Sequence, residues 1–265
     1  MTNSCPKNKK EKNEKYISRY LPHDELQEKL DRHLDYKNFN TRFLHRQRIN
    51  SFLEITKSIS NVNRALDIGC GTGIYSELLL GVSKEIFATD IKKTVLFPKN
   101  KSSFIQMDLQ MLGFKENTFD FIVCSEVLEH IENLNSGLKE IYRILKPNGI
   151  VLISVPNKTS IFWVKNYIKF YFTYFFNKAP SIIRQEYKKH IDFSAFKLIK
   201  LMKSMGFNIL NVYGVFLMLC PIKIIEYFAK EFPQIAYNIC RIDECLLKLD
   251  IKRYSGYLFI LGYKK

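Results

Sequence analysis

The sequence predicts an α/β fold built on a parallel, doubly wound sheet. Between about residues 64 and 155, short apolar runs alternate with stretches of helical periodicity, which is typical of consecutive βαβ units. The runs are rich in Ile, Val, Leu and Phe, as strands are when helices cover both faces of the sheet. A cluster of glycines joins the first run to the helix after it, where the chain must turn tightly.

The predicted elements follow one another in a clear order. Helical periodicity covers 24–60, where Leu26, Leu30 and Leu34 recur every four residues. Strands are expected at 64–70, 85–91, 103–109, 119–124, 150–155, 207–219 and 256–263. The strand at 150–155 is predicted to be wholly apolar. Helices are expected at 73–80, 134–145, 193–205 and 221–249, the second of them ended by the Pro-Asn-Gly sequence at 147–149.

The length of 265 residues and a hydrophobic fraction of 46% fit one large domain. We expect a disordered basic tail at 1–20 and a single domain at 21–265. Its core is predicted to comprise 61–157, 190–218 and 256–265. The stretches 158–189 and 219–255 are interpreted as helical insertions, the first of them rich in aromatic residues.

The charge of the chain favours acidic partners. Forty-one Lys and Arg residues against 26 Asp and Glu residues give a formal net charge of +15, which suits nucleic acid, an anionic lipid surface or a phosphorylated substrate. A basic composition without any function explains the same count equally well. The six cysteines form no Cys-x-x-Cys pair, and no segment has the length and apolarity of a membrane span or a secretory signal. We therefore expect a cytoplasmic protein, with peripheral membrane contact left open.

The residues at 65–73 read Ala-Leu-Asp-Ile-Gly-Cys-Gly-Thr-Gly and carry the strongest functional signal. An apolar strand here runs into a glycine turn and then a helix, which lets the backbone approach a ligand closely. A dinucleotide-binding loop would require glycine or alanine where the bulky Ile74 stands. The spacing is instead Gly-x-Gly-x-Gly, with Asp67 two residues upstream.

This loop resembles motif I of the class I S-adenosylmethionine-dependent methyltransferases, and the similarity extends over about residues 48–206. Acidic residues follow successive predicted strands in the order that this family uses, namely Asp67, Asp90, Asp108 and Glu126. The resemblance implies a Rossmann-like sheet of seven mostly parallel strands. It also implies one antiparallel strand, 256–263, beside the strand at 150–155.

The resemblance implies a site for S-adenosylmethionine. Asp90 would accept hydrogen bonds from the ribose hydroxyls, and Asp108 with the backbone of Leu109 would bind the adenine. Arg48 resembles the arginine that binds the cofactor carboxylate in ubiquinone-biosynthesis-type O-methyltransferases, although a solvated helix arginine is an equal alternative. The full set of expected cofactor contacts is Arg48, Asp67, Gly69, Cys70, Gly71, Gly73, Asp90, Ile91, Asp108, Leu109 and Ser125.

The candidate catalytic residues follow the fourth predicted strand. Glu126, Glu129 and His130, with His190 further on, are similar to a Glu-x-x-Glu-His set in metal-assisted relatives such as the ubiquinone-type and small-RNA 2′-O-methyltransferases. These side chains could bind a divalent ion such as Mg²⁺, which would lower the pKa of an acceptor hydroxyl. Alternatively, Glu126, His130 or His190 acts as a base without metal, or these residues only shape the loop.

The segment 158–189 bears on the methyl acceptor. It contains seven basic residues and one acidic residue, interleaved with many aromatic ones, a composition that fits a membrane interface. A small-molecule or lipid-linked acceptor is therefore expected, either a quinone precursor or a polyprenyl-linked sugar. A lid over the site explains the same residues. RNA is a weaker alternative because no RNA-binding module is recognisable, and a non-enzymatic interaction protein is a further one. The oligomeric state is not predicted.

Overall fold

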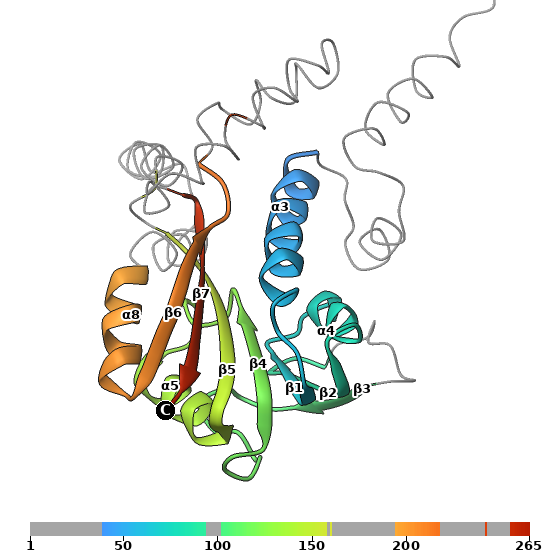
Figure 1. Ribbon diagram of the computed structural model, residues 1–265, viewed down its shortest axis with the longest axis vertical. Helices are drawn as coiled ribbons and strands as arrows, with labels where there is room; N and C mark the ends of the chain where they lie inside the picture. The colour runs from blue at the N-terminus through green and yellow to red at the C-terminus, as the bar shows by residue number, and fades with distance from the viewer. Residues whose placement is uncertain (1–38, 94–101, 158–159, 161–193, 218–241, 243–254) are drawn as a thin grey trace, which may run out of the picture.

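The computed structural model describes residues 39–93, 102–157, 160, 194–217, 242 and 255–265. The strands within them form one seven-stranded sheet (Figure 1). The strand order is β3-β2-β1-β4-β5-β7-β6. Strands β1 to β5 pair in parallel, whereas β7 runs antiparallel to both β5 and β6. This topology confirms the predicted fold class, including the antiparallel strand beside β5. The bounds are β1 Val62–Ile68, β2 Ser83–Asp90, β3 Ser102–Gln106, β4 Phe119–Ser125, β5 Leu145–Pro156, β6 Phe207–Gly214 and β7 Tyr257–Lys264.

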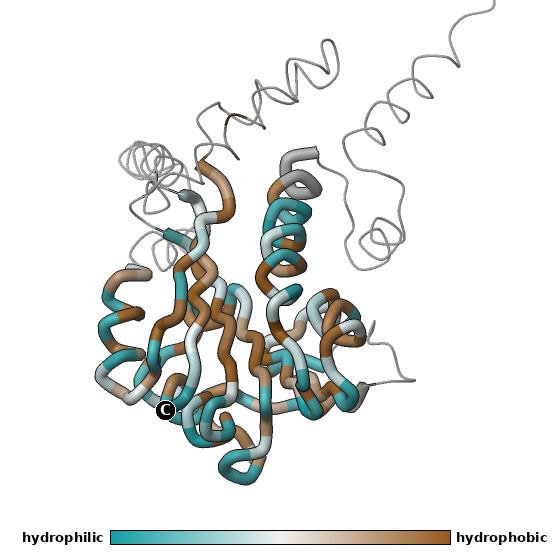
Figure 2. Tube along the Cα trace, in the orientation of Figure 1, coloured by the Kyte–Doolittle hydropathy of each residue, from teal (hydrophilic) through white to brown (hydrophobic). Residues whose placement is uncertain are grey.

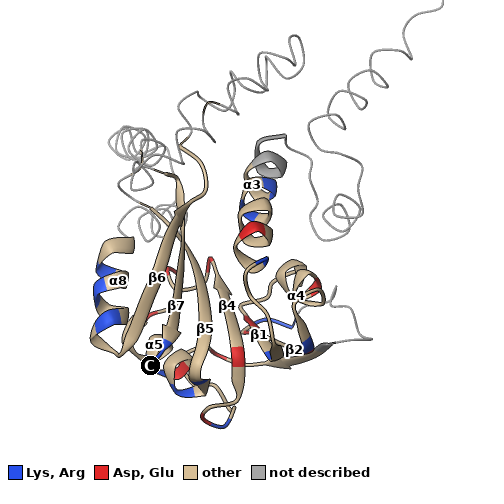
Figure 3. Ribbon diagram, viewed as in Figure 1, with Lys and Arg blue, Asp and Glu red and all other residues tan. Residues whose placement is uncertain are grey.

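Helices cover both faces of the sheet, as doubly wound folds require (Figure 1). Helices α5 (Leu134–Ile144) and α8 (Ala195–Ser204) pack on one face, and α3 (Phe39–Thr56) and α4 (Ile74–Leu79) on the other. Ala195, Leu198 and Met202 of α8 face the sheet, while its lysines at 197, 200 and 203 are exposed, and Figure 3 shows basic residues along this helix. Helix α8 is therefore amphipathic and lies within the predicted helix 193–205.

Alternate residues of the central strands belong to two separate cores. Leu66 and Ile122 pack beneath α5 and α8, whereas Ala65, Phe121 and Val123 pack beneath α3 and α4. Successive side chains of a strand point to opposite faces, so a strand buried on both sides is apolar along its whole length. The hydrophobic residues consequently concentrate in the middle of the sheet (Figure 2). This packing explains why the strands showed no alternation of polar and apolar residues.

Several predicted element boundaries are wrong, among them the end of the strand 207–219, which stops at Gly214. The predicted helix 134–145 ends at Ile144, because Leu145 already pairs with Phe119 as the first residue of β5. The Pro-Asn-Gly sequence thus lies within β5, at a register shift between its pairing with Phe119 and with Phe121. The third predicted strand stops at Gln106, so Asp108 lies in the connection that follows β3.

Several expectations fall outside the described residues. They are the tail 1–20, nearly all of the two insertions, and most of the predicted helix 221–249. Of the helical stretch 24–60, the structure describes the part from residue 39 onward, which contains α3. Within the described ranges, no helix combines the length and apolarity needed to cross a membrane.

Candidate functional site

The glycine loop connects β1 to α4 through three residues with left-handed backbone conformations. Gly69, Gly71 and Gly73 have φ angles of 67°, 51° and 87°, a region that side-chain-bearing residues rarely occupy. The backbone N–H groups of Gly69 and Cys70 both donate to the carbonyl of Thr89, at 2.7 and 3.0 Å. The loop is therefore fastened to the end of β2 by its own backbone.

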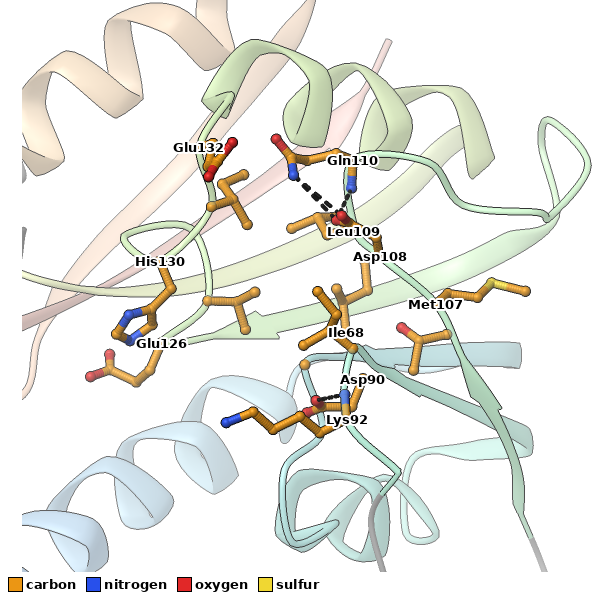
Figure 4. Close-up of a pocket in the computed structure, with 15 residues that line it drawn as sticks. Ile68, Asp90, Lys92, Met107, Asp108, Leu109, Gln110, Glu126, His130 and Glu132 are labelled. Atoms are coloured by element: carbon orange, nitrogen blue, oxygen red, sulfur yellow. Dashed lines mark hydrogen bonds between the residues drawn. The ribbon is translucent and has the colours of Figure 1, made fainter. Parts of the chain in front are cut away.

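A pocket of about 660 Å³ lies beyond the carboxyl ends of the parallel strands (Figure 4). Its wall combines the ends of β1 and β2 with the connections that follow β3 and β4. Open α/β sheets bind their ligands at this edge, and the volume suits a cofactor-sized molecule. The ionisable side chains on its wall are Asp90, Lys92, Asp108, Glu126, His130 and Glu132.

Asp90, the last residue of β2, links this pocket to the glycine loop. Its carboxylate accepts hydrogen bonds from the backbone N–H of Gly71 and from that of Lys92, both at 2.9 Å. A carboxylate offers about four lone-pair positions, so these two bonds leave it able to accept others. Asp90 is thus a fixed acceptor with spare capacity on the pocket wall.

Asp108 is held by a residue that sequence reasoning missed. The backbone N–H of Gln110 donates to the Asp108 carboxylate at 2.8 Å, and the Gln110 side-chain amide lies 3.3 and 3.4 Å from its two oxygens. The side-chain oxygen Oε1 of Gln110 in turn accepts a hydrogen bond from the backbone N–H of Asn133, the N-cap of α5, at 2.9 Å. The Asp-x-Gln spacing was the available signal, because an Asp commonly bonds the N–H two residues on.

Asp67 does not line the pocket, although the family resemblance placed it among the cofactor contacts. Ile68 lines the pocket, so the residue before it points to the opposite face of β1, toward α4. The Asp67 carboxyl is fully buried and accepts a hydrogen bond from Ser76 at 2.5 Å. Burial, opposed in part by that hydrogen bond, raises its pKa from 3.8 to about 7. Asp67 therefore supports the glycine loop from behind.

This burial predicts a pH-dependent stability. The unfolded chain ionises Asp67 near pH 3.8 and the folded chain near pH 7, so the stabilisation is complete below 3.8 and declines as the pH rises to about 7. The decline should be on the order of 1 kcal/mol per pH unit. Asp67→Asn cannot ionise, so its unfolding free energy should lack this component, as urea denaturation at several pH values would show.

The control for Asp67→Asn is Asp120→Asn. Asp120 is held by Lys146 at 2.8 Å and by the N–H of Arg64 at 2.8 Å, and these contacts lower its pKa despite the opposing effect of partial burial. Asp120 should therefore stabilise the fold more as the pH rises, and Asp120→Asn should lose that gain in unfolding free energy. If wild type and Asp67→Asn show parallel pH profiles, Asp67 is ionised within the fold and this account of it is wrong.

Glu126, directly after β4, is fixed from several sides. It has a φ of 58°, which is unusual for a residue with a side chain. Its N–H donates to the carbonyl of Ser154 at 3.0 Å, and the Ser154 hydroxyl donates to Oε1 at 2.9 Å. Arg48 Nη1 lies 2.9 Å from Oε2. Ser154 is a buried polar residue within the strand that was predicted to be wholly apolar, and a polar residue there indicates a hydrogen-bond partner.

Arg48 is buried beneath Glu126 and is not on the pocket wall. Its Nη2 donates to Nδ1 of His45 at 2.6 Å, and its guanidinium carbon lies 5.1 Å from the centre of the Tyr257 ring. Burial and the nearby Arg48 charge lower the pKa of His45 to about 4, so this imidazole is neutral and can accept. The Arg48 guanidinium, which was predicted to bind the cofactor carboxylate, is therefore bonded to Glu126 and His45 in this structure.

Of the residues expected to bind Mg²⁺, those that the structure describes do not form a suitable ligand set. Glu129 is 4% exposed and absent from the pocket wall, and burial together with neighbouring Glu126 raises its pKa to about 9. A neutral carboxyl is a poor ligand for a hard cation, and Glu126 is already paired with the Arg48 guanidinium, whose charge would repel a cation. Across the described residues, no three His, Cys, Asp or Glu side chains gather as metal ligands. His190 lies outside those residues.

The expected cofactor contacts thus divide into two groups. Those on the pocket wall are Gly69, Asp90, Ile91, Asp108 and Leu109, to which the candidate catalytic residues Glu126 and His130 are added. Those that lie behind or beside it are Arg48, Asp67, Cys70, Gly71, Gly73 and Ser125. Of this second group, Gly71 still reaches the site through its hydrogen bond to Asp90.

Comparison with known proteins agrees with this geometry. A family model described as "Methyltransferase domain" matches residues 19–212. The fold resembles the crystal structure of an S-adenosylmethionine-dependent methyltransferase from Thermotoga maritima, with a TM-score of 0.56 and 19% sequence identity. That superposition covers 84% of this chain and 92% of the other.

Two curated relatives have names that refer to ubiquinone biosynthesis and to demethylmenaquinone. The chain is 32% identical over 102 residues to the ubiquinone biosynthesis O-methyltransferase of Rickettsia typhi, which covers 36% of this chain and 41% of that protein. It is 27% identical over 159 residues to the demethylmenaquinone methyltransferase of Oceanobacillus iheyensis, covering 54% and 67%. The chain therefore spans less than two thirds of the length of the first of these relatives.

Proposed function

Because the chain belongs to the methyltransferase-domain family and has the class I fold of its S-adenosylmethionine-dependent members, we propose that it methylates a hydroxyl oxygen of a quinone precursor. A polyprenyl-linked sugar is the second acceptor to test. The observation that carries the proposal is the pocket of about 660 Å³ whose wall joins the glycine loop to Asp90 and Asp108.

The pocket's chemistry supports S-adenosylmethionine as the cofactor. Two vicinal ribose hydroxyls require an acceptor, and Asp90 has the spare lone pairs for them. An adenine ring requires apolar surface beside polar groups, and Ile91 and Leu109 lie on the same wall as Asp108. No atom lies within 4 Å of a Cβ built on Gly71, so space is open beside the loop for a bound molecule.

When bound, S-adenosylmethionine supplies a methyl group activated by a positively charged sulfur. The chain's residues would align an acceptor oxygen with that carbon, and alignment alone can lower a barrier by roughly 7–11 kcal/mol. The oxygen–methyl bond would form as the carbon–sulfur bond breaks and its electron pair stays on sulfur. We assign removal of the hydroxyl proton to His130, which lines the pocket with Glu126 (Figure 4).

Two observations support a quinone-type acceptor on a lipid chain. The first is the names of the two quinone-pathway relatives. The second is the composition of 158–189, in which seven basic residues alternate with aromatic ones, as at membrane surfaces. An apolar chain attached to the acceptor would then remain in the bilayer while its ring entered the pocket.

The test is transfer of a labelled methyl group by the purified full chain. Acceptors to offer are a demethylated quinol in anionic vesicles, a polyprenyl-linked sugar and transfer RNA, with His130→Gln and Asp90→Ala as inactive controls. We expect label on the quinol oxygen. Label on the sugar or on RNA would replace the proposed acceptor, whereas a wild-type chain that binds no S-adenosylmethionine would refute the proposal as a whole.

A further inference from the structure

A buried ion pair ties helix α3 to the acceptor end of the pocket. Arg48 Nη1 and Glu126 Oε2 are 2.9 Å apart, and their side chains are 10% and 21% exposed. These residues are 78 positions apart in the sequence, so the pair forms only when α3 packs against the end of β4. Removing one partner of such a pair leaves an uncompensated charge, which makes each residue depend on the other.

Neighbouring side chains fix both members of the pair. Ser154 donates to the second oxygen of Glu126 at 2.9 Å, and Tyr257 also hydrogen-bonds to this carboxylate. On the other side, His45 accepts from Arg48 at 2.6 Å, and the Tyr257 ring lies against the guanidinium. Glu126 therefore presents to the pocket a carboxylate whose orientation is set by α3, β5 and β7 together.

We propose that Arg48 is a positioning residue that occupies the place of a divalent cation: it holds Glu126 toward the acceptor, and it does not bind the cofactor carboxylate. The inference rests on the proposed function only for the statement that the acceptor lies beside Glu126. A divalent ion at this carboxylate would approach the Arg48 guanidinium at close range, where like charges repel strongly. Of the other predicted metal ligands, His130 lies on the pocket wall but Glu129 does not.

The position of Arg48 carries the second half of the proposal. Arg48 is 8% exposed as a whole residue, and it lies outside the pocket wall that Glu126 helps to form. Its Nε–H has no acceptor among the described residues, yet this atom is enclosed. A ligand carboxylate in the pocket would have to displace Glu126 to reach Arg48. Arg48 should therefore affect the acceptor step through Glu126.

The test measures Mn²⁺ binding by electron paramagnetic resonance and S-adenosylhomocysteine binding by calorimetry on the full chain. The variants are Arg48→Met, Arg48→Lys and the double variant Arg48→Met/Glu126→Gln, which removes both charges and protects the fold. Wild type should bind no Mn²⁺ at the site, and its methyl transfer should be unaffected by EDTA. Arg48→Met and the double variant should also bind no Mn²⁺, because Glu126 lacks the companion ligands that a divalent ion needs among the described residues.

Cofactor binding separates the two roles of Arg48. The double variant should retain affinity for S-adenosylhomocysteine within about threefold, while its methyl transfer falls by about 100-fold. Arg48→Lys should restore part of that rate without Mn²⁺. If Arg48→Met does not fold, the double variant still decides the cofactor question.

Three results would overturn the inference. They are Mn²⁺ binding by wild type that the double variant loses, wild-type methyl transfer by a folded Arg48→Met, or a loss of cofactor affinity of about 30-fold or more in the double variant with an unchanged melting temperature. Failure of the proposed function would look different. Wild type would then not bind S-adenosylhomocysteine at all, and the Mn²⁺ comparison would still test the cation role.

Discussion

Asp90→Ala is expected to weaken binding of S-adenosylmethionine by at least about 100-fold, because two hydrogen bonds to a charged group contribute roughly 1.5–3 kcal/mol each. Asp90 sits at the end of β2, where the backbone N–H groups of Gly71 and Lys92 fix its carboxylate on the pocket wall. Calorimetric titration with S-adenosylhomocysteine measures this loss without requiring the methyl acceptor.

Asp120→Ala is the matched control for this prediction. Asp120 is also a strand aspartate that accepts hydrogen bonds from backbone N–H groups, those of Asn63 and Arg64. It is the second residue of β4, however, and is absent from the pocket wall. It should bind the cofactor as wild type does. Equal affinities for wild type and Asp90→Ala, with both folded, would remove Asp90 from the cofactor site.

The second large effect concerns two glycines that differ in their surroundings. Gly69→Ala would place a Cβ 2.2 Å from Cγ2 of Val127, at a φ of 67° that alanine rarely adopts. The loop or Val127 must shift, so we expect a loss of roughly 1–3 kcal/mol in unfolding free energy. Cofactor binding should be lost as well, because both residues line the pocket.

Gly71→Ala separates stability from binding. Nothing lies within 4 Å of its added Cβ, so the cost in stability is limited to the left-handed backbone, about 1 kcal/mol. The same open space is where the cofactor is proposed to lie, so its affinity should still fall by about tenfold or more. Thermal melting and calorimetry together decide the matter. A Gly71→Ala variant with full affinity would show that the cofactor lies elsewhere.

Val127→Ala provides the rescue for Gly69→Ala. Shortening the side chain removes the methyl groups that lie nearest the added Cβ, so the double variant should be more stable than Gly69→Ala alone. If the two substitutions are merely additive, the contact between these residues does not limit the loop.

The glycine loop and the alternation of strands and helices could be predicted because both depend on local sequence, whereas the topology of the sheet was implied by the family resemblance. An apolar run that ends in Gly69, Gly71 and Gly73 specifies a buried strand and a tight turn, and the structure shows both. Asp90 could be placed at a strand end for the same reason. Local signals of this kind need no knowledge of what packs where.

The direction of individual side chains could not be predicted in the same way. Asp67 is adjacent to the loop in sequence, yet strand alternation sends its carboxyl to Ser76 on the far face. The pairing of Arg48 with Glu126 depends on how α3 packs across the sheet, which no local pattern encodes. Ser154 could have been noticed, because a polar residue in a doubly buried strand requires a partner.

A crystal structure of the full chain with S-adenosylhomocysteine addresses the central assignment most directly. We expect both ribose hydroxyls within hydrogen-bond distance of Asp90 and the adenine between Ile91 and Leu109, next to Asp108. The homocysteine carboxylate should leave the contact between Arg48 and Glu126 intact. Electron density for the ligand outside this pocket, or a ribose facing solvent with Asp90 untouched, would contradict the account.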